Sequence, residues 1–400
     1  MSKFFLAITS LALIFISIVF ALTVGSFVSL LNSQNTDKSA LDNFLTNNAT
    51  DTSVDPKLKV TKVIDGLSNP WDLTFINKDF FYYSQRGGQL RGHNLQTQED
   101  FLLIEPDTSV EGEGGLLGLI ADNDFNNTHY LFSCMNIVNG DHKNIVLTRY
   151  TVTTDLKSIA DSKVIIPDMP SNDSQRHSGC RMTMSIDEGQ IWIGTGDTAN
   201  GTLPQDPNSL GGKILRVDKD GKGVDGNLKA PFDSRIFSYG HRNTQGVVLF
   251  NKPVNGVYGL SAEHGPSIND EVNLLKSGNF GWDPIGSEYN EDVPMTDTSK
   301  FSDAIPAIWS SGDHTDAISG MTIVRGNQWK SWNGAFLIAV LKNEHIKLQT
   351  YGNDWKIIRD EELFKNEYGR IRTIVQSPSG DLYFTTDNGV NDVIMKITPE

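Results

Sequence analysis

The chain has 400 residues, of which 36 are glycine, 15 are proline and 2 are cysteine, and Asp and Glu outnumber Lys and Arg by 49 to 34. The resulting net charge of −15 argues against a nucleic-acid-binding protein, because phosphate backbones attract basic surfaces. Two cysteines exclude a disulfide framework or a cysteine-rich zinc site, and a hydrophobic content of 38% excludes wholesale disorder.

The N-terminal residues 4–31 form an uncharged run rich in Phe, Leu, Ile and Val. A bilayer core needs roughly 20 such residues, whereas the apolar part of a cleaved signal has about 7–15. We therefore expect residues 1–31 to form one helix, either an uncleaved signal anchor or a signal peptide cleaved after Ala21 or Gly25. Lys3 weakly favours a cytoplasmic N-terminus. Both alternatives predict an extracytoplasmic protein that touches the membrane only through this helix.

Residues 32–56 are rich in Asn, Thr, Ser and Asp, and they predict a flexible polar tether between the helix and the rest of the chain. Residues 57–400 are predicted to form one domain. In this part, short apolar or alternating runs are separated by Gly, Asn, Asp and Pro, and no long segment shows a 3.6-residue period. This pattern is typical of an all-β domain with many short strands.

A weak internal repeat refines the prediction. Residues 182–193 resemble residues 374–384, since each passes from an apolar strand through an acidic or glycine turn into an aromatic strand. Further units begin near Trp71, Leu116, Gln245 and Met321. Six units predict a six-bladed β-propeller, with a pair of β-sandwiches as the alternative. The strand at 58–63 is expected to close the ring by joining the last blade, which would protect both sheet edges.

A histidine and an aspartate stand at the two ends of one predicted hairpin. His177 lies in a loop before a strand, and Asp197 follows the next strand. A carboxylate that holds one imidazole nitrogen leaves the other nitrogen free as a general base. A surface hydrogen bond is the alternative interpretation.

Several cations occupy turns and strand ends. Arg242 and Asn243, between two glycines, offer a planar cation and an amide to a carboxylate or carbonyl, although they also fit a capped turn. Arg370 and Arg372 lie on one face of an incoming strand, and Lys342 follows a strongly apolar strand. In a propeller the last three could converge on the axis and form an anion site, or they could be solvated charges.

The segment 263–273 is dense in oxygen ligands. Backbone carbonyls at Gly265 and Pro266, with the nearby acidic side chains, suit a hard cation such as calcium. The spacing is not that of an EF-hand, and an acidic surface loop is the alternative.

Taken in order, six motifs resemble the glucose/sorbosone dehydrogenase family, which consists of soluble six-bladed propellers that use pyrroloquinoline quinone (PQQ). The resemblance covers about residues 60–399. Its motifs are the segments 112–118, 177–181, 240–243, 263–266, 278–282 and 369–372.

The resemblance implies a PQQ- and calcium-dependent dehydrogenase of an aldose sugar or related alcohol, which would need an external electron acceptor. It implies that His177 is the base and that Asp197 orients it. The implied cofactor ligands are Arg242, Asn243, Lys342, Arg370 and Arg372, and the implied calcium ligands are the carbonyls of Gly265 and Pro266. PQQ carries three carboxylates, which suits a group of cations.

Three departures from the family pattern face substrate or cofactor. Arg176 stands where glucose-oxidising members have an acidic residue, and Glu113 stands where a Gln is common. Residues 316–318 replace an Ile-Ala-Pro-like segment. The departures at Arg176 and Glu113 mark candidate substrate-contacting positions and question glucose as the substrate.

Two other function classes remain open at this stage. One is a non-catalytic propeller that binds a glycan or protein partner, and the other is a calcium-dependent lactonase. The sequence also leaves open a homodimer and a disulfide between Cys134 and Cys180, which requires their Cα atoms to lie about 4.4–6.8 Å apart.

Overall fold

The computed structural model describes residues 54–140, 142–284 and 289–400. The predicted N-terminal helix and nearly all of the predicted tether lie outside the described residues. In the described ranges no helix is long and apolar enough to cross a membrane.

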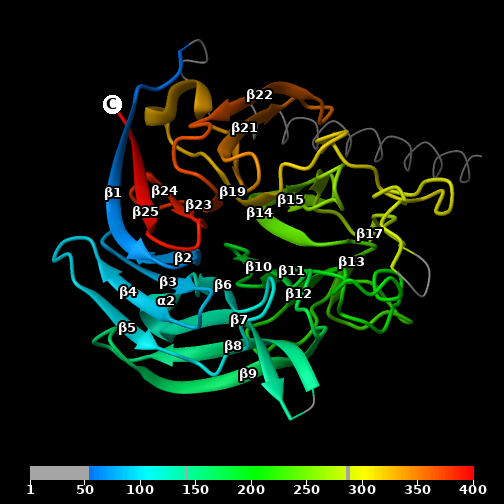
Figure 1. The fold of residues 1–400 in the computed structure, drawn as a ribbon, viewed down its shortest axis with the longest axis horizontal. Helices are drawn as coiled ribbons and strands as arrows, with labels where there is room; N and C mark the ends of the chain where they lie inside the picture. Colours follow the sequence, from blue (N-terminus) through cyan, green and yellow to red (C-terminus); the bar gives the residue numbers. More distant parts are fainter. Residues whose placement is uncertain (1–53, 141, 285–288) are drawn as a thin grey trace, which may run out of the picture. The chain divides into compact units, whose positions relative to one another are not determined.

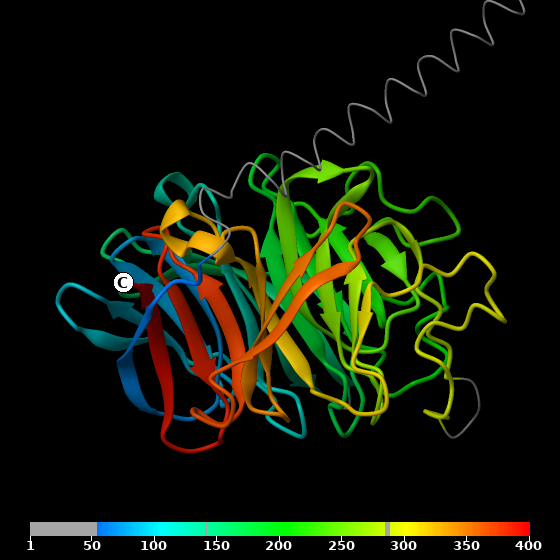
Figure 2. The ribbon, with the colours of Figure 1, turned by 90° about the horizontal axis from the view of Figure 1, so that it is seen from above.

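Six sheets stand around a common centre, so the predicted six-bladed β-propeller is confirmed and the sandwich alternative is wrong (Figure 1). Seen from the side, the strands run from one face of the ring toward the other (Figure 2). The first three sheets are β2 (Pro70–Asn77), β3 (Phe80–Gln85), β4 (Leu90–Asn94), β5 (Asp100–Ile104); β6 (Leu116–Ala121), β7 (Tyr130–Asn139), β8 (His142–Val152), β9 (Ile159–Pro170); and β10 (Gly179–Met184), β11 (Ile191–Thr195), β12 (Lys213–Val217), β13 (Ile236–Tyr239), β17 (Gly278–Asn279).

The other three sheets are β14 (Thr244–Val254), β15 (Val257–Glu263), β16 (Glu271–Leu274), β18 (Trp309–Ser310); β19 (Ile318–Ile323), β20 (Phe336–Val340), β21 (His345–Tyr351), β22 (Ile357–Leu363); and β23 (Ile371–Gln376), β24 (Leu382–Thr386), β25 (Asp392–Pro399), β1 (Leu58–Leu67). Two short helices, α2 (Phe125–Thr128) and η1 (Asn327–Trp332), lie in connections. In the described part of the chain, the strand pairings are antiparallel except the parallel pair β13–β17.

The ring closes where the two ends of the propeller meet. Strand β1 pairs with β25, with Leu58 opposite Pro399 and Leu67 opposite Asp392. The predicted closing strand is therefore confirmed. Each predicted unit start also falls in the first strand of a sheet, and these positions are Trp71, Leu116, Met182, Gln245, Met321 and Ile374.

The first strands of neighbouring sheets contact one another around the axis, and three of them carry glycine at their third position. A Cβ at Gly118 would lie 2.0 Å from the carbonyl oxygen of Cys180, and one at Gly246 would lie 2.4 Å from that of Ser319. A Cβ at Gly320 would lie 2.4 Å from Oγ1 and 2.8 Å from Cα of Thr373 on β23. Glycine is required there because the backbones approach too closely for any side chain.

The apolar core lies between neighbouring sheets rather than in one central mass. Strand β20, for example, is buried along its whole length, which explains its continuous apolar sequence. A disulfide between Cys134 on β7 and Cys180 on β10 ties the second sheet to the third, with the Cα atoms 5.6 Å apart. The sequence had left this pairing open.

An ion pair lies where the first strands converge. Arg181 on β10 lies 2.9 Å from Asp72 on β2, donates to the carbonyl of Gln245 at 2.7 Å, and stacks over Trp71. Arg181 and Asp72 are both buried. Because an unpaired buried charge is costly, this pair fixes where the first strands meet.

We predict that replacing both cysteines by serine destabilises oxidatively folded protein by about 2–4 kcal/mol, because the bridge closes a long loop of the unfolded chain. Urea unfolding of the two forms measures the difference. The purified parent should show no free thiol under denaturing conditions, and two free thiols would contradict the pairing.

Candidate active site

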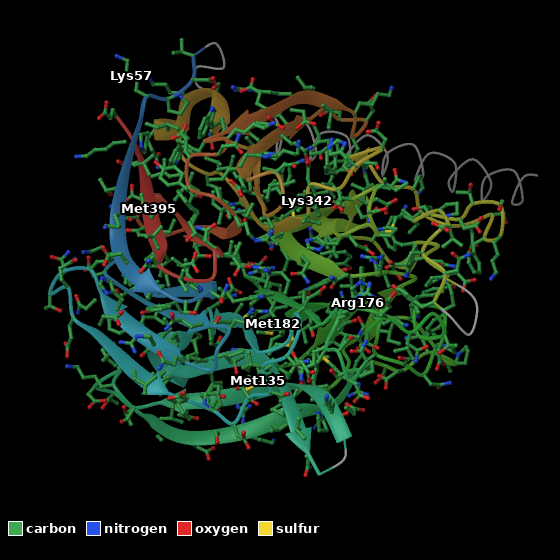
Figure 3. The ribbon with its side chains drawn as sticks, in the orientation of Figure 1. Lys57, Met135, Arg176, Met182, Lys342 and Met395 are labelled. Carbon is green, nitrogen blue, oxygen red and sulfur yellow. A yellow bond between two sulfur atoms is a disulfide. The ribbon has the colours of Figure 1, made fainter. Side chains whose placement is uncertain are left out.

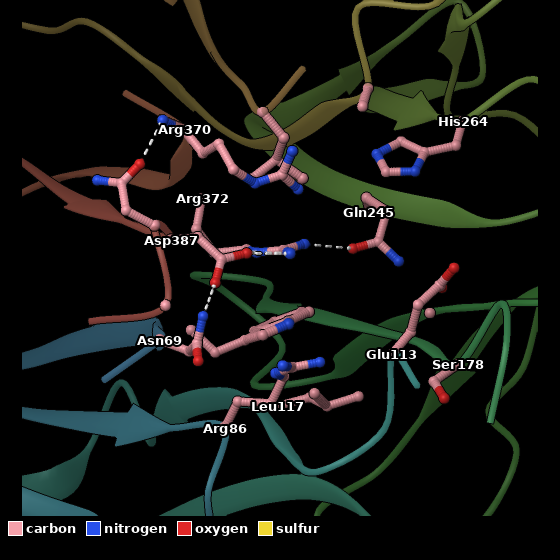
Figure 4. A pocket seen from close by; sticks show the side chains of 16 residues that line it. Asn69, Arg86, Glu113, Leu117, Ser178, Gln245, His264, Arg370, Arg372 and Asp387 are labelled. Carbon is pink, nitrogen blue, oxygen red and sulfur yellow. Dashed lines mark hydrogen bonds and ion pairs between the residues drawn. The ribbon is translucent and has the colours of Figure 1, made fainter. Parts of the chain in front are cut away.

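A cavity of about 500 Å³ opens where the first strands of the sheets begin (Figure 4). Its walls come from the starts of the first strands and from the loops beside them. The lining residues that matter here are Arg86, Glu113, Ser178, Gln245, His264, Ala317, Leu341, Arg370, Arg372 and Asp387.

The cavity wall is rich in arginine. Arg372 pairs with Asp387 and also donates to Oε1 of Gln245 at 3.3 Å. The guanidinium of Arg370 has no hydrogen-bond partner within the described residues, and burial lowers its pKa, with Asp387 opposing that shift. The guanidinium of Arg86 donates one hydrogen bond, of 2.5 Å, to the carbonyl of Gly112. Three arginines therefore gather in the wall of one cavity of a protein whose net charge is negative.

The predicted pair is formed. Nδ1 of His177 lies 2.8 Å from Oδ1 of Asp197, and both side chains are almost fully buried. No hydrogen bond is made at Nε2 of His177 within the described residues. The alternative of a surface hydrogen bond is wrong. His177 is followed directly by Ser178 and Gly179, which line the cavity.

The Asp197 carboxylate is surrounded by donors. Oδ1 also accepts from the backbone N–H of Ala199 at 2.8 Å. Oδ2 accepts from Nε1 of Trp282 at 2.7 Å and from the hydroxyl of Tyr289 at 2.6 Å. Hydrogen bonds of this kind stabilise an ionised carboxylate in a buried site.

Glu113 holds the backbone of the base. Its Oε2 accepts from the backbone N–H of His177 at 2.9 Å, and Asn243 approaches the same oxygen at 3.4 Å. His177 has a φ of 52°, in the left-handed region that non-glycine residues rarely adopt. Glu113 therefore stabilises this strained backbone while its side chain lines the cavity.

Arg242 and Asn243 are buried beside this pair. Arg242 lies 2.6 Å from Glu291 and donates to the carbonyl of His264 at 2.9 Å, while its Nε has no partner within the described residues. Asn243 accepts from the backbone N–H of Gly179 at 3.2 Å. The alternative of a simple capped turn does not account for these contacts.

Two predicted residues are exposed and lie outside the cavity lining (Figure 3). Lys342 follows β20, and its neighbour Leu341 lines the cavity instead. Arg176 precedes His177, and its guanidinium lies 3.4 Å from Glu291. Of the three cations expected to converge on the axis, the structure brings only Arg370 and Arg372 together in the wall.

The acidic side chains of segment 263–273 are buried, so the alternative of an acidic surface loop is wrong. Glu263 accepts from His241 at 3.0 Å, and Asp270 accepts from the backbone N–H groups of Gly265 and Ala317. Burial raises the pKa of Glu271 to about 8, with the charge of Glu263 adding to the shift.

Within the described ranges, no group of three or more His, Cys, Asp and Glu side chains could hold a metal ion. No hydrogen bond to the carbonyls of Gly265 and Pro266 is present there either, so both oxygens remain available as ligands.

Four residues of the site escaped prediction. Trp282 stands in the motif 278–282, but nothing in the sequence assigned it a contact. Tyr289 and Glu291 lie in a segment without regular structure between β17 and β18, and no pattern marked them. His264 lines the cavity, and burial lowers its pKa to about 3, so it is neutral at physiological pH.

Comparisons with known proteins identify relatives of the chain. The chain is 28% identical to the aldose sugar dehydrogenase YliI of Escherichia coli strain K12 over 349 residues, which cover 84% of this chain and 91% of that protein. It is 25% identical to the quinoprotein glucose dehydrogenase B of Acinetobacter calcoaceticus over 286 residues, which cover 63% of this chain and 56% of that protein.

Two solved structures share the fold at 24% sequence identity, and each match covers 86% of this chain and 100% of the other. They are the apo-form of the soluble aldose sugar dehydrogenase from Escherichia coli, with a TM-score of 0.76, and the PQQ-bound aldose sugar dehydrogenase from Streptomyces coelicolor, with a TM-score of 0.68. The family model described as glucose/sorbosone dehydrogenase matches residues 67–395. The chain therefore belongs to the glucose/sorbosone dehydrogenase family.

Proposed function

We propose that the chain is an extracytoplasmic quinoprotein that oxidises an aldose sugar or a related alcohol with PQQ and calcium. The observation that carries the proposal is the buried His177–Asp197 pair beside a cavity walled by arginines. A base next to an anion site is the arrangement that proton removal beside a bound anionic cofactor needs. The relatives named for aldose and glucose oxidation support the substrate class.

The arginines in and beside the cavity fit PQQ. Among the described residues the Arg370 guanidinium has no hydrogen-bond partner, and Arg372 is held in place by Asp387, so both are suited to carboxylates. Arg242 is buried outside the cavity lining, next to His264 in its wall, and its Nε, which has no partner in the described part of the chain, can donate to a quinone or pyridine group. PQQ, when bound, supplies the redox chemistry by accepting a hydride.

The protein residues supply positioning and the proton acceptor. Nδ1 of His177 is held by Asp197, so Nε2 is the nitrogen that takes the proton of the substrate hydroxyl. Glu113 fixes the backbone of the base and reaches the cavity, where it can contact the substrate. Exposed Arg176 lies beside the base, where a substrate would enter.

The proposal includes calcium because the backbone carbonyls of Gly265 and Pro266 accept no hydrogen bond from the described residues. A cation held there would act as a Lewis acid. The disulfide between Cys134 and Cys180 supports an oxidising, extracytoplasmic compartment, in agreement with the predicted N-terminal helix. An external acceptor must remove the two electrons that each turnover leaves on the cofactor.

The first test is a PQQ titration of the purified chain with and without calcium. We expect a saturable change in PQQ absorbance that is stronger with calcium, and dye reduction with some members of a panel of aldoses. Arg370→Met should weaken PQQ binding by roughly tenfold to a hundredfold, as expected for loss of a charge-assisted contact. Arg359→Met removes a cation on β22, outside the cavity, and serves as the control. No PQQ binding by the parent chain would contradict the proposal.

The second test concerns the base. His177→Ala should lower turnover by about 10²–10⁴-fold while PQQ binding stays nearly intact, because the base acts on the substrate. Steady-state kinetics and the same titration measure the two effects. Equal loss of turnover and PQQ binding would show that His177 holds the cofactor instead.

A further inference from the structure

We propose that Tyr289 is a positioning residue for the base, because its hydroxyl, together with the Trp282 indole, holds Asp197 and thereby sets how strongly the His177 ring retains a proton. This inference rests on the proposed function. It adds a role for a residue that no sequence motif marked.

The contacts place Tyr289 on both members of the pair. Its hydroxyl donates to Oδ2 of Asp197 at 2.6 Å and lies 3.2 Å from Nδ1 of His177. The two rings are 5.9 Å apart between centroids. Trp282 donates to the same Oδ2 at 2.7 Å, so two neutral side chains share one carboxylate oxygen.

Tyr289 is held in an unfavourable backbone conformation. Its φ of 48° lies in the left-handed region, which a bulky residue adopts only when its surroundings impose it. Two residues later, Glu291 pairs with Arg242 at 2.6 Å. Contacts at Tyr289 and at Glu291 thus hold this segment in place, and the phenol of Tyr289 points toward Asp197.

The phenol remains a neutral donor over the working pH range. Burial raises the pKa of Tyr289 far above its usual value, and the charge of Asp197 adds to the shift. Each neutral donor to Asp197 stabilises the carboxylate charge and weakens its pull on the proton of the His177 ring. Without the hydroxyl, the imidazolium form becomes more stable, and a higher pH is needed to free the base.

Other charged or titratable groups also act on the His177–Asp197 pair, and replacing Tyr289 by Phe leaves them unchanged. His264 and Arg242 act on this region electrostatically, as does Lys213 on Asp197. Glu113 bonds the backbone of His177, and Glu291 joins Arg242 to Arg176. A change caused by loss of one hydroxyl is therefore measured against constant surroundings.

The experiment compares Tyr289→Phe with the parent in the PQQ-loaded enzyme. We expect the midpoint of the acidic limb of the pH–rate profile to move up by about 0.5–1 pH unit, with a lower kcat and little change in KM. Trp282→Phe removes the second donor to the same oxygen and should move the midpoint in the same direction. Tyr82→Phe is the matched control. Tyr82 lies on β3 of the first sheet, and the change removes a phenol hydrogen bond of 2.9 Å to the carbonyl of Leu156.

A second readout needs neither cofactor nor turnover. The His177 ring signals, identified by their loss in His177→Ala, are titrated by NMR in the cofactor-free protein. Tyr289→Phe should raise that midpoint by the same amount, and Tyr82→Phe should leave it unchanged. Absence of sugar oxidation in the parent would overturn the proposed function, whereas this titration would still test the role of Tyr289.

The outcome that overturns the inference is equally specific. If both midpoints stay at the parent value while the melting temperature falls as in Tyr82→Phe, Tyr289 has only a structural role. A shift to lower pH would also contradict it. Trp282→Phe supplies the same test if Tyr289→Phe does not fold, as judged by near-ultraviolet circular dichroism.

Discussion

The candidate site depends on one buried carboxylate. Asp197 is completely buried, and its two oxygens accept from the His177 ring, a backbone N–H, an indole and a phenol. Burial of a polar or charged group is costly unless hydrogen bonds compensate it, and Asp197 receives such bonds on both oxygens. The same bonds join the end of β11 to the loop before β10 in the same hairpin, and to Trp282 and Tyr289, which lie more than 80 positions further along the chain. The hydrogen bonds that orient the base therefore also hold these segments of the fold together.

The ring geometry creates the cavity, whose lining includes Ser178 and Gly179, the two residues that follow His177. Glycines such as Gly118 and Gly246 let the first strands converge, and the Arg181–Asp72 pair lies where they meet. The space that remains lies where loops enter the first strands, so side chains from several sheets meet there. This explains how a protein with a net charge of −15 concentrates arginines around one cavity.

Much of the fold could be predicted because it follows from local sequence patterns. Repeated strand units marked all six sheets, and the strand at 58–63 pointed to ring closure. The His177–Asp197 pair could be predicted because one hairpin joins the two residues. The Cys134–Cys180 bridge remained open, since it depends on the spacing between two sheets.

The contacts that could not be predicted come from irregular segments and from side-chain direction. Tyr289 is 92 positions from Asp197 and belongs to no strand, so no periodicity connects the two. Glu113 was expected to face the substrate, but its bond to the His177 backbone depends on a left-handed conformation that sequence patterns do not reveal. Lys342 stands at a strand end like Arg370, yet only the latter reaches the cavity wall.

The central claim is that an anionic cofactor binds Arg370 and Arg372, while His177 accepts the proton of a substrate bound beside that cofactor. A crystal structure of the chain with PQQ, calcium and a bound sugar tests this most directly. The account predicts carboxylate contacts to Arg370 and Arg372, with Nε2 of His177 within about 2.6–3.2 Å of the hydroxyl to be oxidised. PQQ bound away from these arginines, or a sugar hydroxyl beyond reach of His177, would contradict it.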